Sequence, residues 1–230
     1  MRTFFAGLLG LLFPSRCAAC DALGAEPFCA DCAETLVATP AGCPVCGVPL
    51  DEALMPALKP RRCGPCRAQA PPFVSARAPF LHGGALAEAI HALKYENREE
   101  LARPLGALFE AVERPRADVI CPLPLHPDRL IHRGYDQAAL LAREAARRFQ
   151  LPLEFLVERA RPTPPQVGRD RKARVRNVAG AFRVASSVRG RSICLVDDVL
   201  TTGATAGEAA RALYAAGARR VEVRTLSRAP

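Results

Sequence analysis

Apolar positions in residues 76–230 recur with two different periods, and each period predicts one kind of secondary structure. A helical period predicts helices at 84–95, 99–112, 137–149 and 203–216. In the first of these helices, Leu86, Ile90 and Leu93 share one face. Short apolar runs predict strands at 78–81, 118–121, 181–184, 192–196 and 220–226.

Strands and helices that alternate with short turns predict an α/β fold, a parallel sheet with helices on both faces. Ligands of such sheets bind beyond the carboxyl ends of the strands. Two predicted strands end at that edge next to residues that could bind a ligand. One ends at Pro122, before the proline-bounded loop 122–127, and the other ends before Asp197 and Asp198.

Residues 1–75 differ from the rest in their cysteines and prolines, and we expect them to form a separate module. Eight of the ten cysteines form four C-x-x-C pairs, Cys17/Cys20, Cys29/Cys32, Cys43/Cys46 and Cys63/Cys66. Two thiolates from one tight turn can reach a single tetrahedral ion, so the pairs predict two structural zinc sites. Sequential pairing is favoured because a short loop costs little entropy to close, and cross-braced pairing stays open. A disulfide framework is the less favoured alternative.

The other two cysteines and the N-terminus call for separate interpretations. Cys121 and Cys194 fall in predicted strands, so we expect buried thiols. The apolar run 2–13 follows one basic residue as in a short signal peptide, but no small-x-small cleavage site follows it. We therefore expect a helix that packs against the cysteine module. No apolar run in the sequence is long enough to span a membrane.

The positive charge is local. The chain carries a formal net charge of +9, yet residues 1–75 contain six basic and six acidic residues. Segment 159–176 alone has seven basic residues against Asp170. It lacks a hydrophobic period, so we expect a mobile loop, and its charge suits a polyanion such as pyrophosphate or nucleic acid. The chain has no tryptophan and three tyrosines, which counts against a dedicated single-strand binder.

The most specific motif is at 193–205, where an apolar strand leads into two adjacent acids and then a Thr- and Gly-containing loop. Main-chain amides and hydroxyls of such a loop can surround a phosphate, and the following helix adds a favourable dipole. Two adjacent carboxylates repel each other unless a ligand or cation uses them. The alternative, an ordinary strand, turn and helix without a ligand, is therefore less favoured.

This stretch closely resembles the phosphoribosyl-pyrophosphate (PRPP) motif of type I phosphoribosyltransferases. The rest of the chain adds further motifs, His91-Ala92-Leu93-Lys94-Tyr95, Pro122-Leu123-Pro124-Leu125-His126, Arg133-Gly134-Tyr135-Asp136-Gln137-Ala138, Thr163-Pro164-Pro165-Gln166 and Arg176-Asn177-Val178. Together with the cysteine module they resemble the ComF (ComFC-like) competence family over essentially the full chain. Members of that family often have Phe and Asn where Tyr135 and Asp136 stand.

The resemblance implies a type I phosphoribosyltransferase fold at 76–230 behind a helix and double zinc module at 1–75. It also implies roles for individual residues. PRPP would be held by Val196, Asp197, Asp198, Thr201, Thr202, Gly203, Ala204 and Thr205, with the two acids on the ribose hydroxyls and the threonine loop on the 5′-phosphate. Pyrophosphate would lie against Leu125, His126, Arg129 and Arg133. Arg169, Lys172 and Arg176, on a loop that closes over PRPP, would act in catalysis with the acid pair. Lys94 is either solvated or part of the site.

The resemblance further implies structural Zn²⁺, Mg²⁺ bound with PRPP, and a role in natural competence, the uptake of single-stranded DNA. Phosphoribosyl transfer to an unidentified acceptor remains open, as do contacts with single-stranded DNA and with membrane-associated uptake proteins. The expected location is the cytoplasm, and a place at the inner face of the membrane stays open. Two alternatives are a metabolic phosphoribosyltransferase of nucleobase salvage and, less favoured because the acid pair is intact, a zinc-dependent adaptor.

Overall fold

The computed structural model describes residues 15–24, 27–50, 62–160 and 180–229. Its centre is a parallel sheet in the order β1-β7-β6-β3, formed by β1 (Ser75–Arg77), β7 (Arg220–Arg228), β6 (Ser192–Leu200) and β3 (Val119–Pro122). A short strand, β2 (Phe80–Leu81), also pairs with β7 in parallel. The α/β fold with a parallel sheet is therefore confirmed.

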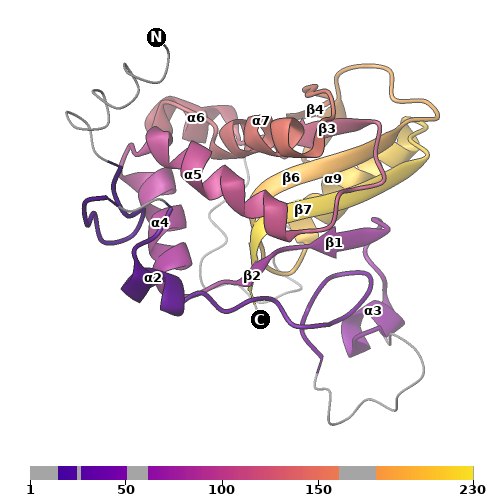
Figure 1. Cartoon of the computed structure of the whole chain (residues 1–230). Helices are drawn as coiled ribbons and strands as arrows, with labels where there is room; N and C mark the ends of the chain where they lie inside the picture. Colours follow the sequence, from indigo (N-terminus) through magenta and orange to yellow (C-terminus); the bar gives the residue numbers. More distant parts are fainter. Residues whose placement is uncertain (1–14, 25–26, 51–61, 161–179, 230) are drawn as a thin grey trace.

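Alternate side chains of β6 enter two different cores, as a strand buried on both faces requires. Cys194 and Val196 pack with α4 (Gly84–Tyr95), α5 (Ala102–Ala107) and α7 (Gln137–Phe149). Ile193 and Leu195 pack with α9 (Ala204–Ala215). The helices thus cover both faces of the sheet (Figure 1).

The predicted helices at 84–95 and 137–149 are confirmed by α4 and α7. The predicted helix at 99–112 is divided into η2 (Glu99–Leu101), α5 and η3 (Leu108–Ala111). Pro104 lies inside it, and a proline removes one helical hydrogen bond and clashes with the preceding turn. The strand predicted at 78–81 is confirmed only at its end, as β2, whereas β1 precedes the predicted range and was not predicted. Pro79 lies between the two strands and has no N–H to donate to a ladder.

Three further elements differ from the prediction. β6 does not end at Val196 but continues to Leu200, because Asp197 and Val199 stay in register with β7. The chain after Pro122 is not loop throughout, since α6 (Pro127–Arg133) follows His126. A two-stranded antiparallel sheet joins β4 (Val157–Arg159), which was not predicted, to β5 (Phe182–Val184).

The two halves of the cysteine module dock at different places (Figure 1). The first half carries α2 (Ala30–Glu34), and Thr35 Oγ1 accepts a hydrogen bond of 2.9 Å from Ala85 N at the start of α4. The second half carries α3 (Gly64–Ala68) and lies along β1, where Ala76 N donates to Val45 O at 2.7 Å. The helix expected at 2–13 lies outside the described residues. None of the helices in the described ranges has both the length and the apolar character needed to cross a bilayer.

Candidate functional site

Asp197 and Asp198 lie near the carboxyl end of β6, inside the strand. Asp198 is 3% exposed and Asp197 is half-buried. Burial and the neighbouring Asp198 raise the pKa of Asp197 well above its usual range, although Lys94 opposes this. Two carboxylates so close and so poorly hydrated provide a strong site for a cation or for ligand hydroxyls.

Lys94, at the end of α4, forms an ion pair with Asp198, with 2.6 Å between Nζ and Oδ1. Burial acts against the charged form, but attraction to Asp198 outweighs it and raises the pKa of Lys94. The second oxygen of Asp198 accepts a hydrogen bond of 3.0 Å from Gln137 Nε2. Lys94 therefore belongs to the site, and the sequence signal for it was its place in the motif 91–95.

The chain after β6 forms the loop expected to hold a phosphate. Gly203 has φ of +74°, a left-handed conformation that favours glycine, and α9 begins at the next residue. Ala204 N lies 3.3 Å from Thr202 Oγ1, to which it donates. Arg228 donates to the carbonyl oxygens of Leu200 and Thr201 at the loop's entry, at 3.0 and 2.7 Å. Arg228, at the end of β7, thus fixes the main chain where this loop begins.

The neighbouring loop 123–126 lies beside the acid pair because Leu123 N donates to Val196 O at 2.9 Å. It ends at His126, which is 8% exposed and whose Nδ1 accepts from Asp128 N at 3.2 Å, capping α6. That nitrogen is committed to the helix end. Arg129 and Arg133, one helical turn apart on α6, line the cavity described below.

Asp136 holds this loop against α7. One carboxylate oxygen accepts from Ala138 N and Ala139 N at the start of α7, at 2.8 and 3.1 Å. The other accepts from Leu125 N at 3.0 Å. Burial raises the pKa of Asp136, and these main-chain donors oppose the rise. Both carboxylate oxygens of Asp136 thus accept hydrogen bonds from main-chain N–H groups.

These elements enclose a cavity of about 750 Å³. Four basic side chains line it, those of Lys94, Arg129, Arg133 and Arg159, against the two acids of β6. Thr201 and Thr205 also line it, whereas Val196, Thr202, Gly203, Ala204 and His126 are not among its lining residues. The surplus of positive charge suits a ligand with several phosphate charges.

Arg159 and Tyr95 are two cavity residues that the predicted site lacked. Burial lowers the pKa of Arg159, and repulsion from Arg129 adds to this. Arg133 lies over the Tyr95 ring, 5.1 Å from its centroid, in a cation–π contact. Tyr95 had a sequence signal in the motif 91–95 and Arg159 in the basic segment 159–176, but only the fold places both at the same cavity. The predicted loop residues Arg169, Lys172 and Arg176 lie outside the described residues.

The eight paired cysteines gather into two groups in the sequential order. Cys17, Cys20, Cys29 and Cys32 form one group, and Cys43, Cys46, Cys63 and Cys66 the other, with all ligand atoms of a group within 4.8 Å of one another. Four thiolates around a tetrahedral zinc stand about 3.8 Å apart, given Zn–S bonds of about 2.3 Å. The 3.6 Å between the sulfurs of Cys20 and Cys29, and of Cys46 and Cys63, fits that ion. All ten cysteines are free thiols, which contradicts the disulfide alternative.

Main-chain hydrogen bonds prepare one thiol in each group for a metal. Burial acts to raise the pKa of Cys17 and of Cys43, but main-chain N–H donors outweigh it and lower each to about 6. These donors come from the thiol's own turn and from the first cysteine of the partner pair, Cys29 or Cys63. Zinc binds the thiolate form, so such turns favour loading near neutral pH. Cys121 and Cys194 behave differently, since burial raises their pKa values to about 11 and about 12. They are buried thiols, as predicted.

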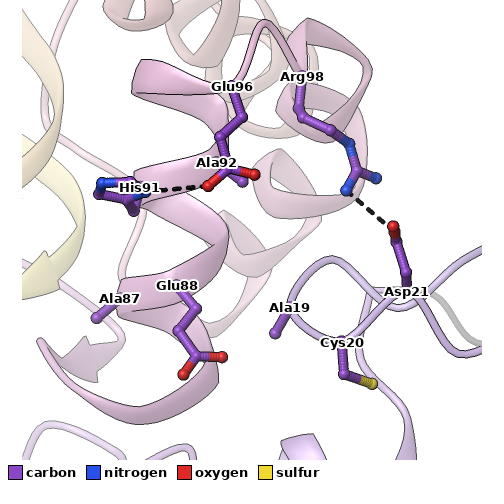
Figure 2. A pocket seen from close by; sticks show the side chains of 9 residues that line it. All are labelled: Ala19, Cys20, Asp21, Ala87, Glu88, His91, Ala92, Glu96 and Arg98. Atoms are coloured by element: carbon purple, nitrogen blue, oxygen red, sulfur yellow. Dashed lines mark hydrogen bonds and ion pairs between the residues drawn. The ribbon is translucent and has the colours of Figure 1, made fainter.

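A second hollow of about 580 Å³ lies between the first cysteine turn and α4 (Figure 2). Its acidic lining comprises Asp21, Glu88 and Glu96. Part of it is occupied by an ion pair of Arg98 with Asp21 at 3.0 Å and by a hydrogen bond between His91 and Glu96 at 3.2 Å. Negative charge makes this hollow unsuitable for a phosphate ligand, so the cavity at the sheet edge is the candidate site.

The fold and the two cysteine groups define a protein with a phosphoribosyltransferase-type domain behind an N-terminal zinc-binding module. Residues 8–67 match the double zinc ribbon domain, and residues 136–230 match the phosphoribosyl transferase domain. The DNA utilization protein YhgH of Escherichia coli (strain K12) is 32% identical over 230 residues, covering 95% of this chain and 99% of that protein. Relatives named competence protein F and competence protein ComFC match as well, and the chain belongs to the ComF family.

The chain is also similar to a second bacterial relative and, in its fold, to solved structures. Competence protein F of Haemophilus influenzae is 32% identical over 181 residues, which cover 74% of this chain and 79% of that protein. Among solved structures, glutamine PRPP amidotransferase from B. subtilis aligns with 22% identity and a TM-score of 0.38, over 53% of this chain and 25% of that chain.

Proposed function

We propose that the protein binds PRPP with Mg²⁺ in the cavity at the sheet edge. The observation that carries this proposal is the adjacent pair of half-buried Asp197 and buried Asp198, the latter bound by Lys94, beside a threonine loop that leads into a helix. Carboxylates at this place suit ribose hydroxyls or a hard cation, and the loop amides suit a terminal phosphate.

The roles follow the sequence motif. Asp197 and Asp198, preceded by Val196, bind the ribose hydroxyls. Thr201, Thr202, Gly203, Ala204 and Thr205 bind the 5′-phosphate. Leu125, Arg129 and Arg133 face the pyrophosphate, and His126 fixes the start of the helix that carries both arginines. Arg159 adds a fourth cation to the same cavity.

Phosphoribosyl transfer would displace pyrophosphate from C1 of the ribose by an acceptor nucleophile. Its transition state resembles an oxocarbenium ion, so charge stabilisation at the leaving group matters more than a strong base. Arg129, Arg133 and Arg159 supply positive charge there, and Arg169, Lys172 and Arg176 of the basic segment would add to it and exclude water. Asp197 and Asp198 would offer the oxygen ligands that Mg²⁺ prefers, and the bound ion would supply further charge neutralisation for the leaving pyrophosphate.

The biological role we propose is natural competence, the passage of single-stranded DNA into the cytoplasm. The names of two relatives, a competence protein and a DNA utilization protein, support this role over nucleobase salvage. The protein would work in the cytoplasm at the inner face of the membrane, with membrane-associated uptake proteins and single-stranded DNA as partners. Zn²⁺ would stabilise residues 1–75 as a module next to the domain at 76–230.

Calorimetric titration of PRPP with Mg²⁺ into zinc-loaded protein tests the proposed site. The double variant D197N/D198N keeps the shape of both side chains and removes their charge, so saturable binding should be lost. Glu158→Gln, which alters an exposed acid paired with Arg183, should bind as the unaltered protein does. Absence of binding to the unaltered protein, or equal binding to D197N/D198N, would contradict the proposal.

A further inference from the structure

Arg228 joins the second cysteine group to the loop that precedes α9. It is the last residue of β7 and is 7% exposed. Its Nε donates to Cys46 O at 3.0 Å, and its terminal nitrogen donates to Leu200 O and Thr201 O at 3.0 and 2.7 Å. Among the described residues its recorded partners are all main-chain carbonyl oxygens. Through these hydrogen bonds the buried guanidinium fixes the main chain both at Cys46 and at Leu200 and Thr201.

One of those places is the turn that carries two expected zinc ligands, Cys43 and Cys46. Three successive carbonyl oxygens of this turn accept hydrogen bonds from the sheet. Arg77 donates to Pro44 O at 2.9 Å, Ala76 N to Val45 O at 2.7 Å, and Arg228 to Cys46 O. The next residue, Gly47, has φ of +68°, and a Cβ there would lie 2.8 Å from Ala76 O. The turn therefore packs closely against β1, and the main chain of β1 leaves no room for a side chain at Gly47.

The other place is the entry to the phosphate loop. Leu200 O accepts from Ala229 N at 2.9 Å as well as from Arg228. Leu200 packs in the same core as Cys43, Cys63 and Cys66 and as Ala206 of α9. The first cysteine group has a different environment, since Ala18 packs with α4 and Thr35 caps that helix.

We propose that Arg228 is a positioning residue through which the second cysteine group, when loaded with zinc, sets the geometry of the phosphate loop 201–205. Zinc bound to Cys43 and Cys46 fixes their turn and so the direction of the Cys46 carbonyl oxygen. Arg228, held by that oxygen, keeps the carbonyl oxygens of Leu200 and Thr201 in place, and the loop amides stay aimed at a phosphate. Loss of this zinc frees one anchor of Arg228 and loosens the loop. The consequence for PRPP affinity rests on the proposed function; the coupling itself does not.

Four variants test the coupling, with zinc content, hydrogen exchange of the amides at 202–206, and PRPP titration as measurements. Arg228→Lys keeps the charge but loses the fork of donors. It should retain both zinc ions, speed exchange at 202–206 about tenfold and weaken PRPP binding about tenfold. C43S/C46S should lose one zinc and have the same two effects. C17S/C20S, at the first group, should lose one zinc and leave exchange at 202–206 unchanged. Arg219→Lys, at an exposed arginine before β7, should change none of the three.

The combined variant R228K/C43S/C46S separates coupling from two independent losses. If the effects pass through one path, its exchange should match that of C43S/C46S alone. Unchanged exchange in Arg228→Lys, or equal loosening by C17S/C20S, would overturn the inference. If the unaltered protein does not bind PRPP, the proposed function fails, and exchange at 202–206 still decides whether the coupling exists.

Discussion

Lys94 and Asp198 are 104 positions apart in the chain, yet their charged atoms meet at 2.6 Å. Their side chains are 20% and 5% exposed, so water screens the pair poorly. The pair anchors the end of α4 to the carboxyl end of β6.

Lys94→Met should therefore destabilise the fold, because it leaves the buried carboxyl group of Asp198 without its cation. Removal of one partner from a buried pair costs about 3 kcal/mol in the free energy of unfolding. Urea unfolding followed by circular dichroism measures this loss. Adding Asp198→Asn should recover part of it. As a control, Arg183→Met breaks an exposed pair and should cost less than about 1 kcal/mol. A Lys94→Met loss no larger than that of the control would contradict the ion pair's role.

The raised pKa of Asp197 predicts a dependence of stability on pH. Because the folded state holds the proton more tightly than the unfolded state, this group's contribution is present near the ordinary pKa of 3.8 and is lost as pH rises through the raised value. Asp197→Asn removes the titration. Its stability relative to the unaltered protein should therefore increase as the pH rises above the ordinary pKa of 3.8. Urea unfolding at several pH values measures the difference, and a constant difference would refute the raised pKa.

Asp136→Ala should destabilise the protein by about 2 kcal/mol, because it removes the cap of α7 and the acceptor for Leu125 N. Asp136→Asn keeps one oxygen for the cap and should cost less. Asp128→Ala, at an acid whose side chain is 69% exposed, serves as the control and should cost under about 0.5 kcal/mol. Urea unfolding ranks the three variants. Equal losses for Ala and Asn at position 136 would show that the cap contributes little.

Removal of zinc by a chelator should unfold the cysteine module before the sheet. The module has few large apolar side chains, so metal binding supplies much of its folding free energy. Hydrogen exchange should accelerate first in residues 17–50 and 62–67 and later in β6. Protein reloaded with zinc should regain its original exchange. Unchanged exchange in 17–50 after the metal has left would contradict a structural role for zinc.

The sequence by itself determined the elements whose signals are local. Helix α4 and helix α7 have long apolar periods, and their bounds were predictable. The motif 193–205 placed a strand, an acid pair and a loop in order, because each depends only on neighbours in the chain. Spacing also favoured the sequential cysteine groups, since eight intervening residues let Cys20 and Cys29 share one ion, but it left cross-braced pairing open until the fold brought the sulfurs together. Even α6 had a signal in Pro127, which favours the first turn of a helix, but seven residues give too short a period.

The tertiary structure alone decided which distant residues meet. The order β1-β7-β6-β3 brings the end of α4 over β6, and only then does Lys94 reach Asp198. The same order puts Arg228 beside both Leu200 and Cys46. It also extends β6 past Val196, because pairing with β7 outweighs the poor strand preference of two aspartates. Such contacts depend on how strands pair across the sheet, and no local pattern of residue types encodes that.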